Sequence, residues 1–419
     1  MTTMAIDNKD KKVLKSSIER EQNEVACSAE CEKIKGSKNL NVPPLRFPEF
    51  SGEWKCTTIG NIGDIKNGPF GSVLHAEDYV ENGIPIVTTE HFKTGLMPSD
   101  KFGIPQVSNE DYIRLKGYRL ETNDIVFSRV GSVDINAHVG IEQNGWLFSG
   151  RVLRVRPKYD IDSLFLHYAL STEAVKRDIR NRAVGQTMPS INTPILSSTT
   201  IQLPKDLFEQ KKVAHFLRLL DERIITQNKI IEKLQSLIKG IAQHCIKEST
   251  SGNTYVKLGD ICQITTGKLD ANAQVDNGIY PFFTCAEQPF KIDSFAFDTE
   301  ALLISGNGAN LGYINYYKGK FNAYQRTYVL DLFSENIQYI KWALKVLLPK
   351  RIAIEKSSSN TPYIVLSTLT DLRLPIPCKS KQSFIANLMQ SLERKLSNQI
   401  AQYDSYNYLK QYLLRQMFI

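Results

Sequence analysis

Long hydrophobic runs are missing from this sequence of 419 residues. No apolar stretch reaches the roughly 20 residues that a membrane-spanning helix needs. The first residues, MTTMAIDNKDKKVLKSS, carry charge but no apolar core, so we expect no secretory signal peptide. The seven cysteines are scattered and odd in number, which argues against a disulfide framework. These absences predict a soluble protein of the reducing cytoplasm that contacts no membrane.

Motifs for catalysis are also scarce. The glycines near Gly267-Lys268 and in the stretch 304–312 give neither the G-x-x-x-x-G-K spacing of a phosphate-binding loop nor a helix-opening G-x-G-x-x-G. A G-x-S-x-G nucleophile elbow is absent. The six histidines form no pair at metal-ligand spacing, and Cys27 and Cys31 lack a second ligand pair. We therefore predict a chain without catalytic residues, metal or cofactor of its own.

The net charge is modest and unevenly placed. The chain has 52 Lys and Arg against 44 Asp and Glu, a formal net charge of +8. Residues 45–204 hold 17 basic and 18 acidic side chains, residues 251–378 hold 12 and 11, and most of the excess lies in 205–250 and 379–419. A basic balance suits a polyanion partner. The near-neutral segments must gather their basic residues on one face if they contact nucleic acid.

The sequence contains an internal repeat. IGNIGDIKNG (59–68) matches LGDICQITTG (258–267) at its aliphatic and glycine positions, so Gly68 corresponds to Gly267. Further matched pieces follow in the same order: 123–132 with 300–309, 139–141 with 311–313, 164–170 with 338–344, and 188–204 with 361–377. Matched segments in a fixed order indicate duplicated structural units. Each half has the same plan, a globular unit followed by a long charged segment.

The globular units are predicted to be mixed α/β. DIVFSRV and ALLIS indicate short buried strands, RVLRVRP a half-buried strand, and SLFLHYALST and IQYIKWALKVLL helices with one apolar face. A chain of this length exceeds one ordinary core. The predicted division is an N-terminal extension, helical or disordered, at 1–41, a globular unit at 42–204, a helix at 205–250, a second unit at 251–377 and a second helix at 378–419.

Apolar residues in both charged segments recur in alternating steps of four and three, the seam of a coiled coil. The helix-seam positions are Val213, Leu217, Leu220, Ile224, Gln227, Ile231 and Leu234 in the first segment and Ile385, Met389, Leu392, Leu396, Gln399 and Tyr403 in the second. No proline interrupts either run, and Lys410 is the one charged residue in the register. We expect an α+β fold in which two long antiparallel coiled-coil helices separate two tandem mixed α/β units, with an internal pseudo-two-fold repeat.

Gln227 and Gln399 fall at equivalent seam positions. A buried polar residue in a seam weakens the packing but fixes the register. We predict that these two glutamines set the alignment of the helices. The alternatives are a partly exposed site, or glutamines that are present only because they are good helix formers.

Two similar units joined by long helices are suited to binding a long regular polymer. Duplex DNA is the obvious candidate, because its readable sites repeat along an axis. Glycine-rich loops would carry the contacts, since Arg pairs well with guanine and Asn or Gln with adenine. The candidate loops are 88–95, 114–119 and 128–138 in the first unit, and 265–274, 305–310 and 317–326 in the second. The candidate DNA-binding residues are Lys93, Arg114, Lys116, Arg119, Arg129, Asn136, Lys268, Asn307, Asn310, Lys320, Gln325 and Arg326. Each of them could instead be an ordinary solvated loop residue.

Three stretches resemble a known family. VPPLRFPEFSGEWKCTTIGNI (42–62) is similar to the opening of the specificity subunits of type I restriction–modification enzymes. LPKDLFEQKKVAHFLRLLDERI (203–224) and its weaker echo LPIPCKSKQSFIANLMQSLERKL (374–396) resemble the same family. The resemblance implies two target recognition domains separated by conserved spacer helices. It also implies a bipartite double-stranded DNA target, with one half-sequence per domain.

The resemblance further implies partner subunits. Two modification (methyltransferase) subunits would bring S-adenosylmethionine chemistry, and restriction subunits would bring ATP- and Mg-dependent translocation and cleavage. This chain would then direct chemistry that it does not perform. The sequence departs from the family pattern in the added residues before position 42, and in the tyrosine-rich SYNYLKQYL with Lys410 in the seam.

Two other functions fit parts of the sequence. A coiled-coil scaffold whose globular units bind proteins rather than DNA is favoured by the near-neutral charge of those units. A stand-alone nuclease or methyltransferase would need a catalytic constellation that the sequence lacks. DNA binding with a steep salt dependence would exclude the scaffold, because phosphate contacts release counterions.

Overall fold

The computed structural model describes residues 41–69, 74, 76–249, 254–355 and 363–419. It divides into two compact units, which are treated separately below. Unit 1 holds Met1–Glu222 and Asn407–Ile419, and unit 2 holds Arg223–Tyr406. Except for Asn41, the predicted N-terminal extension lies outside the described residues, and so do Cys27 and Cys31 within it.

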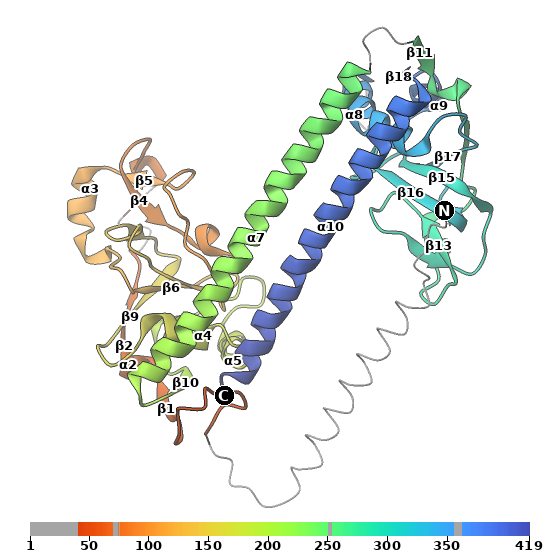
Figure 1. Cartoon of the computed structure of the whole chain (residues 1–419). Helices are drawn as coiled ribbons and strands as arrows, with labels where there is room; N and C mark the ends of the chain where they lie inside the picture. The colour runs from red at the N-terminus through yellow and green to blue at the C-terminus, as the bar shows by residue number, and fades with distance from the viewer. Residues whose placement is uncertain (1–40, 70–73, 75, 250–253, 356–362) are drawn as a thin grey trace, which may run out of the picture. The chain divides into compact units, whose positions relative to one another are not determined.

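Unit 1 is a mixed α/β unit, as predicted (Figure 1). Its strands are β1 (Lys55–Thr58), β2 (Gly63–Asn67), β3 (Tyr79–Val80), β4 (Ile84–Val87), β5 (Gln106–Val107), β6 (Ile125–Ser128), β7 (Asn136–His138), β8 (Leu147–Phe148), β9 (Val152–Pro157) and β10 (Thr200–Leu203). Its helical elements are α2 (Ile59–Ile62), η2 (Ala76–Asp78), η3 (Thr89–Phe92), α3 (Asn109–Arg114), η4 (Lys116–Tyr118), α4 (Ser163–Leu170), α5 (Glu173–Arg182), α6 (Thr193–Ser197) and the first part of α7 (Leu207–Glu248). The strands form sheets in the orders β2-β9-β6-β7 and β3-β5-β4-β8, and β1 pairs with β10.

Strand β6 explains why the sheet β2-β9-β6-β7 has a core on each face. Ile125 and Phe127 share one core with Phe165 of α4, whereas Val126 belongs to a second core that contains Phe148. Successive side chains of a strand point to opposite faces. A strand buried on both faces reads as a continuous apolar run, which is the pattern of DIVFS in the sequence. The candidate loop 128–138 therefore leaves from the end of a doubly covered sheet.

Unit 2 follows the same plan with fewer additions. Its strands are β11 (Thr254–Lys257), β12 (Gln263–Thr266), β13 (Tyr280–Phe283), β14 (Phe290–Ile292), β15 (Phe297–Ser305), β16 (Ile314–Ala323), β17 (Thr327–Asp331) and β18 (Arg373–Ile376). Its helical elements are η5 (Leu258–Asp260), η6 (Ala271–Ala273), α8 (Ile337–Glu355), α9 (Leu366–Thr370) and most of α10 (Lys379–Gln416). The strands form a sheet in the order β12-β17-β15-β16-β13-β14, and β11 pairs with β18.

The strand pairings show that the sequence repeat is also a structural repeat. The antiparallel pairs β2–β9, β6–β9 and β1–β10 of unit 1 correspond to β12–β17, β15–β17 and β11–β18 of unit 2. A parallel pair also recurs, with Val87 opposite Phe148 in unit 1 and Phe283 opposite Ala323 in unit 2. The predicted α+β fold with two similar mixed units is confirmed.

Helices α7 and α10 pack against each other in an antiparallel sense within unit 2 (Figure 1). The Gln227 amide donates to Gln399, and the Lys381 ammonium donates to the Glu248 carbonyl at 3.1 Å. Residue numbers therefore rise along α7 as they fall along α10. The predicted long antiparallel helices are confirmed.

Each of the predicted helix-seam residues is buried or half-buried. In unit 1, Val213 and Leu217 of α7 share a core with Leu413 of α10. In unit 2, Leu234 of α7 shares a core with Met389 of α10. The seam of each helix thus faces the apolar interior of the unit to which it belongs.

Lys410, the charged residue in the second seam, has a partner of opposite charge in unit 1. Its ammonium lies 2.6 Å from Asp221 of α7, and the Tyr168 hydroxyl donates to the other oxygen of that carboxylate at 2.8 Å. Burial raises the pKa of Tyr168, and the Asp221 charge raises it further. The carboxylate therefore joins α4, α7 and α10, and the lysine completes its contacts.

The two seam glutamines contact each other within unit 2. The Gln227 side-chain amide donates to the Gln399 backbone carbonyl at 3.0 Å and to its side-chain oxygen at 2.9 Å. Gln227 is buried, whereas Gln399 is half-buried. Such a pair satisfies the buried amide only when the two residues face each other, which is the property that fixes a register.

Replacing Gln399 alone with leucine is expected to lower the free energy of unfolding of unit 2 by about 1–3 kcal/mol, because the buried Gln227 amide loses a partner. Replacing both glutamines with leucine is expected to recover most of that loss, since two apolar side chains leave no group unpaired. Denaturant titrations of the two single variants and the double variant measure the coupling. Strictly additive losses would contradict the pairing.

The segment before β1 is held onto the long helices of unit 1. The Arg46 guanidinium donates to both oxygens of Glu209 on α7 at 2.7 Å, and the Trp54 indole N–H donates to the same carboxylate at 3.1 Å. The Leu45 N–H donates to the Gln416 carbonyl of α10 at 2.8 Å. One buried carboxylate thus connects the start of the described chain to α7.

Candidate nucleic-acid interface

The candidate loop 128–138 of unit 1 is tied to two other segments by backbone hydrogen bonds. The Arg129 N–H donates to the Arg151 carbonyl at 2.9 Å, and the Ile191 N–H donates to the Arg129 carbonyl at 2.9 Å. These bonds join the loop after β6, the turn before β9 and the segment before α6. The three segments form one connected surface at the end of β6.

Arg151 lies at the third position of a tight turn, 149–152, that leads into β9. The Val152 N–H closes the turn by donating to the Ser149 carbonyl at 3.0 Å, and the Gly68 N–H donates to the Val152 carbonyl at 3.1 Å. A Cβ on Gly68 would lie 2.0 Å from the Ser149 carbonyl oxygen. Only glycine permits this approach, so the repeated glycine supports the turn from behind.

Unit 2 builds the same arrangement at the end of β15. The Gly306 N–H donates to the Arg326 carbonyl at 2.8 Å, and the Ile364 N–H donates to the Gly306 carbonyl at 2.8 Å. The turn 324–327 is closed by the Thr327 N–H, which donates to the Tyr324 carbonyl at 2.8 Å. Arg326 therefore occupies the turn position that Arg151 occupies in unit 1.

Gly267 supports this second turn as Gly68 supports the first. Its N–H donates to the Thr327 carbonyl at 3.3 Å. A Cβ on Gly267 would lie 1.9 Å from the Ala323 carbonyl oxygen and 2.6 Å from the Tyr324 carbonyl oxygen. The equivalence of Gly68 and Gly267, first seen in the sequence, thus has a structural cause.

Other candidate residues of unit 2 gather around Arg326. Cys285 donates through its sulfur to the Asn307 side-chain oxygen at 3.0 Å, and the Asn310 amide donates to the Cys285 carbonyl at 3.1 Å. The Gln325 amide donates to Asp270 at 2.8 Å. These contacts orient the candidate amides before any ligand binds.

The two candidate lysines of unit 2 are both exposed. Lys268 follows Gly267 in the loop 265–274. The Lys320 ammonium on β16 lies 4.6 Å from the centroid of the Phe295 ring. The structure therefore brings together Asn307, Asn310 and Arg326 with the loop of Lys268, and it places Lys320 on the strand that leads to them.

Three candidate residues of unit 1 are exposed: Lys93, Arg114 and Lys116. Lys93 lies 2.5 Å from Glu90, and Arg114 lies 2.6 Å from Asp111. Exposed pairs of this kind contribute little to stability, so their cations can exchange the carboxylate for a phosphate at small cost. They are available for contacts to a phosphate backbone, which carry no sequence information.

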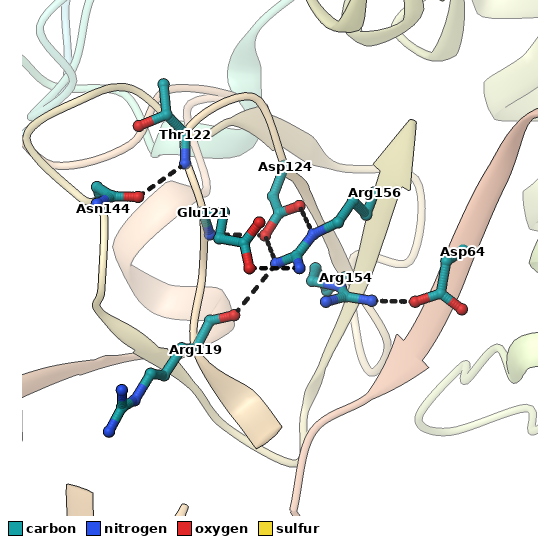
Figure 2. Close-up of polar contacts among 8 residues, drawn as sticks. All are labelled: Asp64, Arg119, Glu121, Thr122, Asp124, Asn144, Arg154 and Arg156. Atoms are coloured by element: carbon teal, nitrogen blue, oxygen red, sulfur yellow. Dashed lines mark hydrogen bonds and ion pairs between the residues drawn. The ribbon is translucent and has the colours of Figure 1, made fainter. Parts of the chain in front are cut away.

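Arg119 is half-buried and stacks on an aromatic ring. Its guanidinium carbon lies 3.9 Å from the centroid of the Tyr112 ring, and one terminal nitrogen donates to the Tyr112 carbonyl at 3.4 Å. Figure 2 shows that the side chain points away from the neighbouring carboxylates. Stacking holds a guanidinium flat and leaves its edge able to donate.

The arginines of β9 belong to the scaffold of unit 1 (Figure 2). Arg156 donates to both oxygens of Asp124 at 2.7 and 2.8 Å and to Glu121 at 2.6 Å, and Arg154 forms an ion pair with Asp64. Burial lowers the pKa of Arg154, and the neighbouring Arg156 lowers it further. Because their charges are used internally, these arginines fix the strand ends and are not contacts for a ligand.

Asn136 is buried, which corrects its assignment as a base contact. It is 2% exposed, its side-chain oxygen lies 2.7 Å from the His167 Nδ1, and its amide donates to the Ser171 hydroxyl at 3.3 Å. The pairing of β7 with β6 carries this residue into the interior. Both groups of the amide are used inside unit 1, so a base cannot reach them.

The buried His167 ring should make unit 1 sensitive to acid. Burial lowers its pKa from 6.5 to about 3. Between these values the unfolded chain binds a proton that the folded unit does not, so stability falls as the pH drops below about 6.5. The expected loss is about 1.4 kcal/mol per pH unit, or about 2 kcal/mol at pH 5.

Hydrogen exchange of the α4 peptide at pH 7.5 and pH 5.0, corrected for intrinsic rates, measures this loss. The variant His167→Gln should weaken the pH dependence, while His215→Gln at an exposed position of α7 should leave it unchanged. An identical pH dependence in the wild type and His167→Gln would show that His167 is not the cause of the acid sensitivity.

Sequence reasoning missed two parts of this surface. One is Arg151, although SGRVLRV and YQRTYVL place an arginine at the same position before equivalent strands. The other is the hairpin 184–190, in which Val184 and Ser190 exchange both backbone hydrogen bonds at 2.9 and 2.8 Å. Its apolar side chains Val184 and Met188 are exposed. No periodic signal marks so short a hairpin.

The described residues offer no group of three or more His, Cys, Asp or Glu side chains that could hold a metal ion. Within the same part of the chain, every helix is too short or too polar to cross a membrane.

Two mixed units carry the same exposed arginine turn at matched strand ends, so the chain presents two similar surfaces. A family model described as "Type I restriction modification DNA specificity domain" matches residues 51–236 and 250–403, once for each half of the chain. The chain belongs to this DNA specificity family.

Curated relatives carry corresponding names. The type I restriction enzyme EcoDI specificity subunit of Escherichia coli is 44% identical over 137 residues, which are 33% of this chain and 30% of that protein. The type I restriction enzyme MjaVIII specificity subunit of Methanocaldococcus jannaschii is 24% identical over 399 residues, covering 83% of this chain and 87% of that protein.

Solved structures share the fold. The crystal structure of a type I restriction–modification system S subunit from M. genitalium has a TM-score of 0.63 at 18% identity, covering 90% of this chain and 99% of that chain. A chain from a structure of the type I R-M system, described in terms of complex assembly and conformational transition, has a TM-score of 0.54 at 17% identity, covering 89% and 99%. At these identities the likeness concerns the fold.

Proposed function

We propose that this chain is the non-catalytic sequence-specificity subunit of a type I restriction–modification complex in the cytoplasm. It recognises a bipartite double-stranded DNA target, with one half-site for each unit. The observation that carries this proposal is the matched surface at the ends of β6 and β15. The same turn and backbone hydrogen bonds recur there among loops whose side chains differ. A shared backbone scaffold that carries different loops is suited to two units that recognise different half-sites.

The chemistry then lies in partner subunits. Two modification subunits supply methylation from S-adenosylmethionine, and restriction subunits supply ATP- and Mg-dependent translocation and cleavage. Large apolar side chains remain exposed along α7: Phe208, Phe216, Leu219, Ile230 and Leu237. Exposed apolar residues along a helix support docking of protein subunits there.

A protein-binding scaffold is the second candidate, because the segments 45–204 and 251–378 are near neutral. The complex of this chain with its modification subunits separates the two. Binding to duplex DNA should fall steeply with KCl concentration, since each neutralised phosphate contributes about 0.9 to the slope of log K against log[salt]. A complex that forms but binds duplex DNA weakly, with no salt dependence, would favour the scaffold.

A further inference from the structure

Arg151 and Arg326 occupy matched positions in the two units. Each is the third residue of a tight turn, 149–152 or 324–327, and each turn leads directly into a central strand. Both side chains are exposed. In the part of the chain that the structure describes, neither guanidinium has a hydrogen-bond or ion-pair partner, whereas Arg114 is paired with Asp111.

The backbone around both arginines is fixed in the same way. Each turn is closed by its own hydrogen bond, and each arginine carbonyl accepts from the N–H of the residue that follows the neighbouring strand. Gly68 or Gly267 packs behind the turn so closely that a Cβ would meet a backbone carbonyl oxygen at 2.0 or 1.9 Å. The scaffold therefore sets where each arginine starts and leaves its charged end in solvent.

The surroundings of the two arginines differ in sequence. Arg151 is joined through Arg129 to the loop VGSVDINAH, whereas Arg326 is joined through Gly306 to NGANLG. Side chains that read bases must vary when two units read different sequences. Both units have arginine at the same turn position although the neighbouring loops differ. Such a shared residue is suited to the part of DNA that does not vary with sequence, which is the phosphate backbone.

We propose that Arg151 and Arg326 are equivalent phosphate contacts, one in each unit, that hold the DNA backbone of each half-site while the adjacent loops contact bases. The proposal rests on the proposed DNA-binding function. Arginine suits this task because its planar guanidinium donates two parallel hydrogen bonds to phosphate oxygens. An acidic peptide of a partner subunit would present similar oxygens, and the test distinguishes it.

The test uses the full chain assembled with its modification subunits. The probe is a duplex with the methylated sequence mapped in cells that produce this complex. Its affinity is measured across a KCl series for Arg151→Ala, Arg326→Ala and the double variant. Each single variant should lower the slope of log K against log[KCl] by about 0.9, and the double variant by about twice that amount. The methylated sequence should not change.

Matched controls keep the result specific. Arg151→Lys and Arg326→Lys should retain most of the slope, because an ammonium still neutralises a phosphate. Arg177→Ala on α5 and Arg373→Ala on β18 remove exposed arginines outside the turns and should leave the slope unchanged. Unchanged melting temperatures show that the variants fold.

Three results would overturn the proposal. An unchanged slope would show that the arginine does not contact a phosphate. A relaxed sequence preference at one base of one half-site would show that the arginine contacts that base. Loss of modification subunits on gel filtration, with an unchanged slope, assigns the arginines to a protein partner. A wild-type complex whose duplex binding does not depend on salt would overturn the proposed function itself. If the wild type is salt-sensitive and the variants have the same slope, only the phosphate contact is overturned.

Discussion

Replacing Glu209 with alanine is expected to lower the free energy of unfolding of unit 1 by about 3–5 kcal/mol. The Glu209 side chain is 2% exposed and accepts three hydrogen bonds, two from Arg46 and one from Trp54. Its removal leaves Arg46, whose side chain is 12% exposed, without its counter-charge and the buried Trp54 indole N–H without its acceptor. The cost is large because the indole N–H cannot regain water as a partner and the carboxylate that held the arginine is gone.

Hydrogen exchange of the peptide 45–54 together with a urea titration measures this loss. Glu222→Ala on the same helix is the matched control, since it removes an exposed pair with Arg218 and should change the free energy of unfolding by at most about 0.5 kcal/mol. A Glu209→Ala variant as stable as the Glu222→Ala variant would show that the buried carboxylate does not hold the segment.

Replacing Gly267 with alanine is expected to lower the free energy of unfolding of unit 2 by about 1–3 kcal/mol or more, because the added Cβ forces the backbone of the turn to move. That Cβ would lie 1.9 Å from the Ala323 carbonyl oxygen. Backbone atoms cannot rotate away as a flexible side chain can. Because the turn carries Arg326, the same change should weaken recognition of the half-site read by unit 2. Gly68→Ala should do the same in unit 1.

Gly240 on α7 provides the control for both glycine substitutions. A Cβ at this position meets nothing within 4 Å, so alanine should raise helix stability by about 0.5–1 kcal/mol. Thermal unfolding and half-site methylation of the three variants give the comparison. If Gly267→Ala and Gly240→Ala raised stability alike, the close approach of the turn would not constrain the fold.

Sequence alone predicted the parts of the fold that depend on local pattern. The steps of four and three place Leu217 and Met389 in the cores of their units, and the repeat predicted two units of one plan. Both signals are periodic or duplicated, so each is supported by many residues at once. The equivalence of Gly68 and Gly267 was visible because glycine is required wherever backbones approach closely.

The candidate interface was predicted less well, because exposure depends on pairing between distant strands. Asn136 lies in a polar loop sequence, yet β7 pairs with β6 and buries its amide against His167. Arg119 stacks on Tyr112 through a contact that no spacing rule supplies. Arg151 emerged only when its turn could be compared with that of Arg326. A sequence gives residue types in loops, but tertiary contacts decide which of them remain free.

Under the proposed function, each unit reads its own half of a bipartite DNA target. The most direct test exchanges residues 54–200 for the first unit of another member of the family and maps methylation genome-wide in cells that supply the modification subunits. A bipartite methylated sequence is expected in the wild type, and a change confined to one half is expected in the chimera. Changes in both halves, or an unchanged sequence, would contradict it.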